Sequence, residues 1–334
     1  MPATMLTVAE IFALAQRVLA SNGCDAANAA AAARTIAGAE RDRCLSHGLF
    51  RLPGYVASLR SGKVDGRAAP RITRRTPVIL NVDGGGGLAP LALEHVGPDL
   101  ARAAKEYGVA AAAIVRSHHF AALWPEAEML AAEGLIALTC LNYVPVVAPH
   151  GGREPIFGTN PLCIAWPRPG REPVVLDMAT SAMARGEVQI AARERRTVPL
   201  GAGLDADGQP TTDPAAILRG VLLPFGGHKG SGLALMVELL AAAAIGERFS
   251  FESAIEDNHD GGPPRGGQLL LALSPELLGD SGWAEHAERF FARYASIEGA
   301  RLPGERRLAS RRDPGPRDVD VELLDRVRAL ERRV

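Results

Sequence analysis

The sequence predicts a globular chain that mixes helices with strands and lacks the dinucleotide-binding motif of Rossmann folds. Its 334 residues suffice for about two domains, and 47% apolar with 22% charged residues is typical of a protein with a large core. Short apolar runs such as 78–82 and 109–115 indicate strands, and patterns such as 25–41 indicate helices. The glycines after the first strand do not complete Gly-x-Gly-x-x-Gly, because its last position falls on Ala89 or Pro90.

Composition also indicates which partners to expect and in which cellular compartment the protein works. A formal net charge of −1 provides no long-range field for nucleic acid or an anionic membrane, so neither partner is expected. No uninterrupted apolar run reaches the roughly 18 residues of a membrane span, and the N-terminus has no signal-peptide pattern. The four cysteines show neither Cys-x-x-Cys nor metal-ligand spacing, which is typical of a reducing compartment. We therefore expect a cytoplasmic protein.

Helix signals dominate the N-terminal part. Thr7 and Glu10 form a capping-box pattern ahead of an apolar helical stripe, and an alanine-rich helix is expected over 25–41. If the next segment is also helical, His47 and Arg51 stand one turn apart on one face. A proton donor beside a carboxylate-binding guanidinium would suit a small organic acid, whereas a solvated basic face is the simpler interpretation.

Strands and helices follow one another over the rest of the chain. Further strands are expected at 136–142, 162–166, 174–176 and 268–273, and further helices at 100–107, 184–193, 283–297 and 319–334. The polar, glycine-rich stretches 197–214 and 256–267 are expected to be loops, and 301–307 a basic turn. Polar residues just past strand ends are where sites are usually built.

The stretch from Pro224 to Gly232 is the most distinctive of the chain. Glycines bracket His228 and Lys229, and an apolar helical pattern follows. Glycines let a backbone approach a ligand closely, and a helix N-terminus attracts anions. The stretch therefore predicts a phosphate or carboxylate cradle, with an ordinary glycine-rich turn as the alternative. It is not a P-loop, because Gly-x-x-x-x-Gly-Lys-Ser/Thr is not matched.

The adjacent histidines His118 and His119 do not predict a metal site. Successive side chains of a strand point to opposite faces, so these two would diverge. The zinc motif His-Glu-x-x-His is absent as well. We therefore expect no metal.

Six motifs taken together resemble those of one enzyme family. In chain order they are Ser46-His47-Gly48, Ser117-His118-His119, Phe157-Gly158-Thr159-Asn160-Pro161, Asp177-Met178-Ala179-Thr180-Ser181, Pro224-Phe225-Gly226-Gly227-His228-Lys229-Gly230 and Leu302-Pro303-Gly304-Glu305-Arg306. Over nearly its whole length the chain resembles the malate/L-lactate dehydrogenase-2 type of NAD(P)-dependent oxidoreductases. Within this family, the segment from Phe120 to Trp124 is closest to the Δ1-piperideine-2-carboxylate/Δ1-pyrroline-2-carboxylate reductases.

The resemblance implies an α+β fold that is not a Rossmann fold. A helical domain would comprise residues 1–75 with 300–334. The central domain, 76–299, would contain a mostly antiparallel sheet flanked by helices and would bind the nicotinamide cofactor. Such proteins are typically homodimers, with the active site between the domains and near the subunit interface.

The resemblance also assigns catalytic and substrate-binding roles. His47 would donate a proton, with Ser46 beside it. Glu187 would be the assisting carboxylate, at a position where the imine reductases are expected to carry an aspartate. Arg51 would hold the substrate carboxylate. The threonines expected to contact the substrate are Thr159 and Thr180.

Four segments would line the cofactor site by the same resemblance. They are His119, Phe120, Ala121, Ala122 and Leu123; Asp177, Met178 and Ala179; His228 and Lys229; and Gly304, Glu305 and Arg306. The basic pair Arg306-Arg307, together with Lys229, favours NADPH, because a 2′-phosphate needs cationic partners. NADH would be the weaker alternative.

The resemblance implies a cyclic ketimine carboxylate as the substrate, reduced to L-pipecolate or L-proline. A flat apolar ring suits an aromatic-lined pocket with one arginine and one proton donor. A malate site would need a second cation, and none is evident beside Arg51. The alternatives are a malate/lactate-type 2-hydroxy-acid dehydrogenase and a non-enzymatic binder of small acids. Because both His47 and the cofactor turn are present, an enzyme is favoured over a binder.

Overall fold

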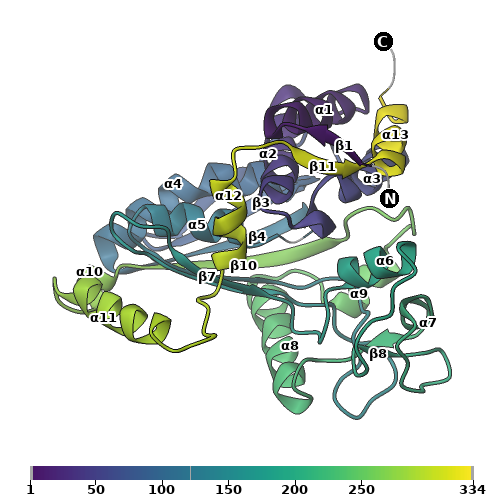
Figure 1. Ribbon diagram of the computed structural model, residues 1–334. Helices are drawn as coiled ribbons and strands as arrows, with labels where there is room; N and C mark the ends of the chain where they lie inside the picture. Colours follow the sequence, from purple (N-terminus) through teal and green to yellow (C-terminus); the bar gives the residue numbers. More distant parts are fainter. Residues whose placement is uncertain (1–2, 121, 332–334) are drawn as a thin grey trace.

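A seven-stranded sheet forms the centre of the molecule (Figure 1). The computed structural model describes residues 3–120 and 122–331. In the strand order β2-β3-β4-β10-β5-β6-β7, only β3 and β4 are parallel neighbours, so the sheet is mostly antiparallel, as expected. The strands are β2 (Arg71–Thr76), β3 (Ile79–Leu88), β4 (Val109–His118), β5 (Ile136–Leu141), β6 (Leu162–Trp166), β7 (Val174–Met178) and β10 (Arg265–Leu273).

Helices cover both faces of this sheet. α4 (Ala89–Tyr107) and α5 (Trp124–Ala132) lie on one face, and α8 (His228–Ala241) lies on the other (Figure 1). α4 is the crossover that a parallel pair of neighbouring strands requires. The main core fills the space under α4 and α5 with fully buried side chains such as Ile114 and Leu130.

A second core lies around the N-terminal helices. It is formed by α1 (Val8–Ser21), α2 (Ala26–Arg41), α3 (Leu52–Ser61) and α13 (Val321–Ala329). Beside it, β1 (Ala3–Leu6) pairs with the antiparallel β11 (Arg317–Asp320) (Figure 1). The segment after residue 316 is thereby held against the first helices of the chain.

The remaining elements are short and lie in the connections. They are η1 (Leu45–His47), η2 (Leu49–Arg51), α6 (Arg185–Arg193), β8 (Gly203–Leu204), α7 (Pro214–Arg219), β9 (Val221–Leu222), η3 (Ala243–Ile245), α9 (Ser250–Ile255), α10 (Pro275–Leu278), α11 (Trp283–Ala295) and α12 (Glu305–Arg312). α12 lies against the edge strand β7, where Arg307 Nη2 donates to the carbonyl of Val175 at 3.4 Å. This contact brings α12 to the end of the sheet.

Most of the predicted elements are confirmed, and the differences have local causes. The capping box of Thr7 and Glu10 is formed, and β6 matches the strand expected at 162–166. The strand expected at 78–82 is too short, because β3 continues through the glycines to Leu88 with a shift of register on the way.

The predictions for the C-terminal part are only partly right. The basic turn expected at 301–307 contains the beginning of α12. The helix expected at 319–334 begins only at Val321, because the residues before it form β11. Its strand partner, β1, is about 300 residues away in the sequence, which local periodicity does not reveal. Residues 332–334 of that prediction lie outside the described range.

α8 has apolar side chains on its outward face as well as a buried carboxylate on its inward face. Glu238 is 4% exposed and accepts hydrogen bonds from Asn160 Nδ2 at 2.8 Å and from the Ser250 N–H at 3.0 Å. The exposed apolar side chains are Leu233, Leu235, Met236, Leu239 and Leu240. Residues 228–245 are the one described stretch that could cross a membrane by length and composition alone, although Glu238 interrupts its apolar run and 33% of it is buried.

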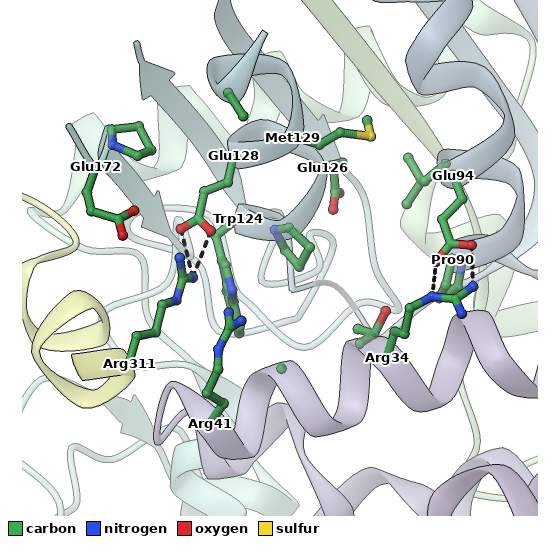
Figure 2. Close-up of a pocket in the computed structure, with 16 residues that line it drawn as sticks. Arg34, Arg41, Pro90, Glu94, Trp124, Glu126, Glu128, Met129, Glu172 and Arg311 are labelled. Carbon is green, nitrogen blue, oxygen red and sulfur yellow. Dashed lines mark hydrogen bonds and ion pairs between the residues drawn. The ribbon is translucent and has the colours of Figure 1, made fainter. Parts of the chain in front are cut away.

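A buried carboxyl group lies between α5 and the sheet. Glu126, labelled in Figure 2, stands in the first turn of α5 and is 5% exposed. It accepts a hydrogen bond from Gln268 Nε2 at 2.6 Å. The same amide donates to Thr139 Oγ1 at 2.9 Å. Burial raises the pKa of Glu126 to about 8, with a smaller contribution from the charge of Asp177. The folded protein therefore holds a proton here at pH values where the unfolded chain has lost it.

Replacing Glu126 with Gln should remove one pH dependence of stability. Between the ordinary pKa of 4.5 and the folded-state value of about 8, the folded protein binds more protons than the unfolded chain. The free energy of unfolding therefore falls as the pH rises through this window, by up to about 1.4 kcal/mol per unit. In urea denaturation, the free energy of unfolding of Glu126→Gln should rise by about 1–3 kcal/mol relative to that of the wild type as the pH increases from about 5.5 to about 8.

The exposed Glu276 provides the matched control. Glu276→Gln should leave the pH dependence of the wild type unchanged. The same response from both variants would contradict a proton held by Glu126.

Candidate active site

The segment that carries His47 and Arg51 consists of two short 3-10 turns. η1 ends at His47, η2 runs from Leu49 to Arg51, and Gly48 separates them with φ −86° and ψ −142°. The single helix assumed for this segment is therefore wrong. Both side chains nevertheless line the same cavity.

This cavity, of about 180 Å³, brings together most of the predicted catalytic groups. The predicted residues that line it are Ser46, His47, Arg51, Phe120, Thr159, Asp177, Met178, Ala179, Glu187 and Arg306. They come from η1 and η2, the loops before α5 and β6, the end of β7, the first turn of α6 and the first turn of α12. Segments more than 250 residues apart in the sequence therefore meet at one site.

Some predicted residues lie behind this lining. Thr180 is buried, and its Oγ1 donates to the carbonyl of Thr159 at 3.0 Å. His119, Ala122 and Leu123 are also buried, and Gly304 and Glu305 stand at the start of α12. Ala121 lies outside the described residues.

The predicted cradle at His228 and Lys229 stands apart from the cavity. Both residues are exposed in the first turn of α8 and do not belong to the described lining. Gly226 and Gly227 before them have φ values of 56° and 63°, which explains why glycines are needed there. The turn chemistry was thus predicted correctly, and a cofactor contact at these residues stays a prediction.

His47 is held between a hydroxyl group and an aromatic ring. Its Nδ1 is 3.1 Å from Ser46 Oγ, and its ring meets that of Trp124 edge-on with centroids 6.1 Å apart. A hydroxyl group at this distance can fix the orientation of the imidazole. The other ring nitrogen, Nε2, is then the one suited to exchange a proton with a ligand.

Arg51 is a partly buried cation without a carboxylate partner among the described residues. Its Nε donates to the Ser46 carbonyl at 2.6 Å, and its guanidinium carbon lies 4.8 Å from the ring centroid of Phe120. Burial lowers the pKa of Arg51, but a guanidinium stays charged at neutral pH. A guanidinium held this way is suited to bind an anionic ligand.

Asp177 connects the end of β7 to the start of α5. Its Oδ2 accepts the backbone N–H groups of Leu123 at 3.1 Å and Trp124 at 3.0 Å. Burial raises the pKa of Asp177 to about 6, while the charge of Arg307 and the two N–H donors oppose the increase. This aspartate therefore fixes the segment that precedes α5 against the cavity.

Buried polar atoms near the cavity fit a nicotinamide cofactor. Both ring nitrogens of His119 and the Nε of Arg307 are buried without a hydrogen-bond partner among the described residues. Burial lowers the pKa of His119 to about 4, so its ring is neutral near pH 7. An unsatisfied buried polar group costs about 1–3 kcal/mol, so such groups mark places where a ligand can complete the bonding.

A second cavity, of about 490 Å³, shares Trp124 with the first (Figure 2). Its described lining includes none of the predicted site residues. Arg311 of α12 donates to Glu128 at 3.0 Å and to both oxygens of the buried Asp42. Arg34, on the opposite side in Figure 2, is paired with Glu94. Because these guanidinium groups already have carboxylate partners, the contacts serve mainly to anchor α12 and α2.

Sequence reasoning missed several residues of the first cavity. Arg185, Gly186 and Tyr143 line it, whereas Arg307, which also lines it, was expected from the sequence as part of the basic pair Arg306-Arg307. The sequence offered no signal for the first three. They are ordinary residues of a loop and a helix start, and only the fold brings them to the site.

Comparison with known proteins identifies the family of this chain. The family model described as malate/L-lactate dehydrogenase matches residues 6–325. The chain belongs to the malate/L-lactate dehydrogenase family. As a member of this family it is an oxidoreductase that uses a nicotinamide cofactor.

Two relatives within this dehydrogenase family show how similar the chain is to imine reductases. It is 48% identical over 311 residues to Δ1-pyrroline-2-carboxylate reductase 1 of Burkholderia ambifaria. The aligned region covers 92% of this chain and 91% of the relative. It is 47% identical over 303 residues to the Δ1-pyrroline-2-carboxylate/Δ1-piperideine-2-carboxylate reductase of Pseudomonas putida. This alignment covers 90% of this chain and 89% of that protein.

Solved structures of the family have the same fold. The crystal structure of Δ1-piperideine-2-carboxylate reductase from Pseudomonas syringae pv. tomato matches with a TM-score of 0.92 and 43% identity, over 98% of this chain and 99% of that one. A dehydrogenase from Sinorhizobium meliloti matches with a TM-score of 0.89 and 32% identity, over 99% of both chains. The helices and the mostly antiparallel sheet are thus the family fold.

Replacing Gly186 with Ala should displace Arg51. A Cβ atom at Gly186 would lie 2.5 Å from Arg51 Nη2 and 2.9 Å from Ser46 Cβ, which is too close for either contact to persist. We expect the affinity for a small planar carboxylate such as pyrrole-2-carboxylate to fall at least about tenfold, or ~1.4 kcal/mol. Calorimetric titration measures this. Gly38→Ala, where no atom lies within 4 Å of the added Cβ, should bind like the wild type. Unchanged affinity in Gly186→Ala would contradict the placement of Arg51.

Proposed function

We propose that this protein reduces Δ1-pyrroline-2-carboxylate and Δ1-piperideine-2-carboxylate to L-proline and L-pipecolate. The observation that carries the proposal is the position of Arg51. This partly buried guanidinium, without a carboxylate partner among the described residues, lines the same small cavity as His47. A volume of about 180 Å³ suits a five- or six-membered ring with one carboxylate. The names of the Burkholderia and Pseudomonas relatives support this substrate class.

The roles of the residues follow from what the reduction requires. When bound, a reduced nicotinamide would supply the hydride that reduces the carbon of the C=N bond. His47 supplies the proton that the ring nitrogen needs, because an imidazole exchanges protons near neutral pH. Ser46 orients the imidazole through the 3.1 Å contact. Glu187, exposed where it lines the cavity, stabilises the imidazolium form in this proposal.

Substrate binding is assigned to three other groups. Arg51 pairs with the carboxylate, and the face of Phe120 beside it offers an apolar wall to the ring. Thr159 lines the cavity and can donate a hydrogen bond through its hydroxyl group. The buried Thr180 holds Thr159 in place, because its hydroxyl group donates a hydrogen bond to the Thr159 carbonyl.

A 2-hydroxy-acid dehydrogenase of the malate type stays the second candidate because of Arg185. The expectation that no second cation accompanies Arg51 is wrong, since Arg185 lines the same cavity and its charge contributes to the lowered pKa of Arg51. A dicarboxylate would therefore find two cations. The preference for a cyclic imine depends on the relatives and on the aromatic wall of Phe120.

A parallel assay of four substrates tests the proposal. Oxidation of the reduced cofactor is followed with Δ1-pyrroline-2-carboxylate, Δ1-piperideine-2-carboxylate, pyruvate and oxaloacetate at equal concentration. The imines should be turned over faster than both oxo acids. Faster reduction of oxaloacetate than of either imine would reject the proposal in favour of the malate-type alternative.

Two variants connect this activity to the cavity. His47→Ala should lower kcat by about two to four orders of magnitude while the cofactor still binds. Arg51→Ala should mainly raise KM, by the equivalent of about 2–5 kcal/mol, because it removes the partner of the carboxylate. The exposed His95 and Arg102 on α4 provide matched controls, and their alanine variants should behave like the wild type. Near-normal turnover in His47→Ala would refute its role.

NADPH is the preferred cofactor in this proposal. Arg306 and Arg307 in the first turn of α12 line the cavity and offer guanidinium groups to a 2′-phosphate. The segments around His119, Asp177 and Gly304 would hold the rest of the cofactor. The contribution of Lys229 and His228 would come from the start of α8.

Replacing Arg306 with Ala should reduce the preference for NADPH. We expect kcat/KM with NADPH to fall at least about tenfold while kcat/KM with NADH stays within about twofold, because only NADPH carries the 2′-phosphate. Steady-state kinetics with both cofactors at one ionic strength measures this. Arg312→Ala, an exposed position on the same helix, is the control. Equal losses with both cofactors would argue against a 2′-phosphate contact.

A homodimer and a two-domain division complete the proposal. The exposed apolar face of α8 supports a homodimer, because five large side chains of one helix would otherwise meet water. The two separate cores support a helical domain of residues 1–75 with 300–334 beside a central cofactor-binding domain of 76–299 without a Rossmann phosphate loop, except that β2 (Arg71–Thr76) belongs to the central sheet. A cytoplasmic location would suit a nicotinamide-dependent enzyme of amino-acid metabolism.

Charged substitutions on α8 test the homodimer. The double variant Met236→Glu with Leu239→Glu should shift the mass measured by light scattering from a dimer toward the 35.2 kDa of one chain. Two buried charges in an interface cost several kcal/mol. Leu200→Glu, at a side chain that is 71% exposed in a loop, should leave the mass unchanged. A wild-type protein of monomer mass would contradict the proposal directly.

A further inference from the structure

A buried carboxyl group lies directly behind the segment that carries His47. Glu40, in the last turn of α2, is 3% exposed. Its Oε1 accepts the backbone N–H of Leu49 at 2.7 Å, within buried surroundings. Leu49 begins η2, the turn that ends at Arg51. The carboxyl group therefore contacts the backbone between the two functional side chains.

The same carboxyl group explains why position 48 is a glycine. A Cβ atom on Gly48 would lie 2.1 Å from Glu40 Oε1 and 2.5 Å from its carboxyl carbon. The φ of Gly48 is −86°, which is not the left-handed conformation that favours glycine, although its ψ of −142° lies outside the α and β regions of residues with side chains. The space that a side chain would need is filled by the carboxyl group.

This arrangement is costly for a group with a purely structural role. Burial raises the pKa of Glu40 to about 7, with the Leu49 N–H opposing the increase and the charge of Asp318 on β11 adding to it. A carboxyl group taken out of water destabilises a fold unless hydrogen bonds compensate. Among the described residues the compensation is one hydrogen bond, from the backbone N–H of Leu49, which lies two residues after His47.

We propose that Glu40 is a positioning residue, which fixes the backbone at Gly48 and Leu49 and so sets the His47 imidazole and the Arg51 guanidinium at the separation that one substrate needs. The inference rests on the roles proposed above for these two residues. Proximity effects explain its importance, since a shift of about 1 Å between reacting groups can cost about a hundredfold in rate.

Four variants test the proposal: Glu40→Ala, Glu40→Gln, Gly48→Ala and the double variant Glu40→Ala with Gly48→Ala. For each we would measure kcat, KM for the imine, cofactor affinity by fluorescence, and melting temperature. Glu40→Ala should lower kcat about 10- to 100-fold while cofactor affinity stays within about twofold. Glu40→Gln should stay within about threefold of the wild type, because its amide oxygen can still accept the Leu49 N–H.

The double variant separates a positioning contact from two unrelated defects. Gly48→Ala alone should lose activity, since its Cβ displaces the carboxyl group. Added to Glu40→Ala, the same change should cost clearly less than it does alone, because the group it collides with is gone. Three outcomes would each overturn the proposal. The first is that the losses of kcat in the two single variants multiply in the double variant. The second is that Glu40→Gln is as inactive as Glu40→Ala, and the third is that Glu40→Ala folds and keeps a near-normal kcat.

Two provisions keep the outcome clear. Should Glu40→Ala fail to fold, Gly48→Ala and Glu40→Gln decide: the first must lose kcat and the second must keep it. The wild type is assayed first on imines and oxo acids, and all variants are then measured on the substrate it prefers. A wrong substrate class and a wrong role for Glu40 therefore give different results.

Discussion

Carboxyl groups removed from water hold the walls of the active-site cavity in place. Glu40 fixes the turn after His47, Asp177 fixes the start of α5, and Asp42 holds α12 through Arg311. Each of these groups is costly to bury and is tolerated only with donors at short distance. Their donors are three backbone N–H groups and the guanidinium groups of Arg41 and Arg311, so the position of the main chain around the cavity is set by electrostatics as well as by apolar packing.

Much of the fold follows from local signals in the sequence. The capping box at Thr7, the alanine-rich α2 and the strand β6 are encoded within a few residues and were predicted. The pairing of β1 with β11 was not, because strand partners distant in sequence leave no local periodicity. The same holds for the two turns around Gly48, whose break depends on a carboxyl group from the preceding helix.

The site shows the same division between local and distant information. The motifs that contain His47, Thr159 and Asp177 are recognisable in the sequence, and the fold brings these residues to one cavity. Arg185 gave no such signal, since an arginine at the start of a helix is ordinary until the cavity beside it is known. It is also the residue that keeps a dicarboxylate substrate in consideration. The preference of this chain among small acids is therefore proposed to depend partly on a residue that motif patterns do not mark.

The lining of the cavity includes residue 44 near the start of the chain and residue 307 near its end. α12 is held in place by the ion pair of Arg311 with Asp42. On the ribosome, the first of these lining residues emerges long before the second. Long-range contacts of this kind slow folding, because a large loop must close before they form. The N-terminal helices, whose core also needs α13, would remain incompletely packed for most of translation and would depend on protection from aggregation during that time.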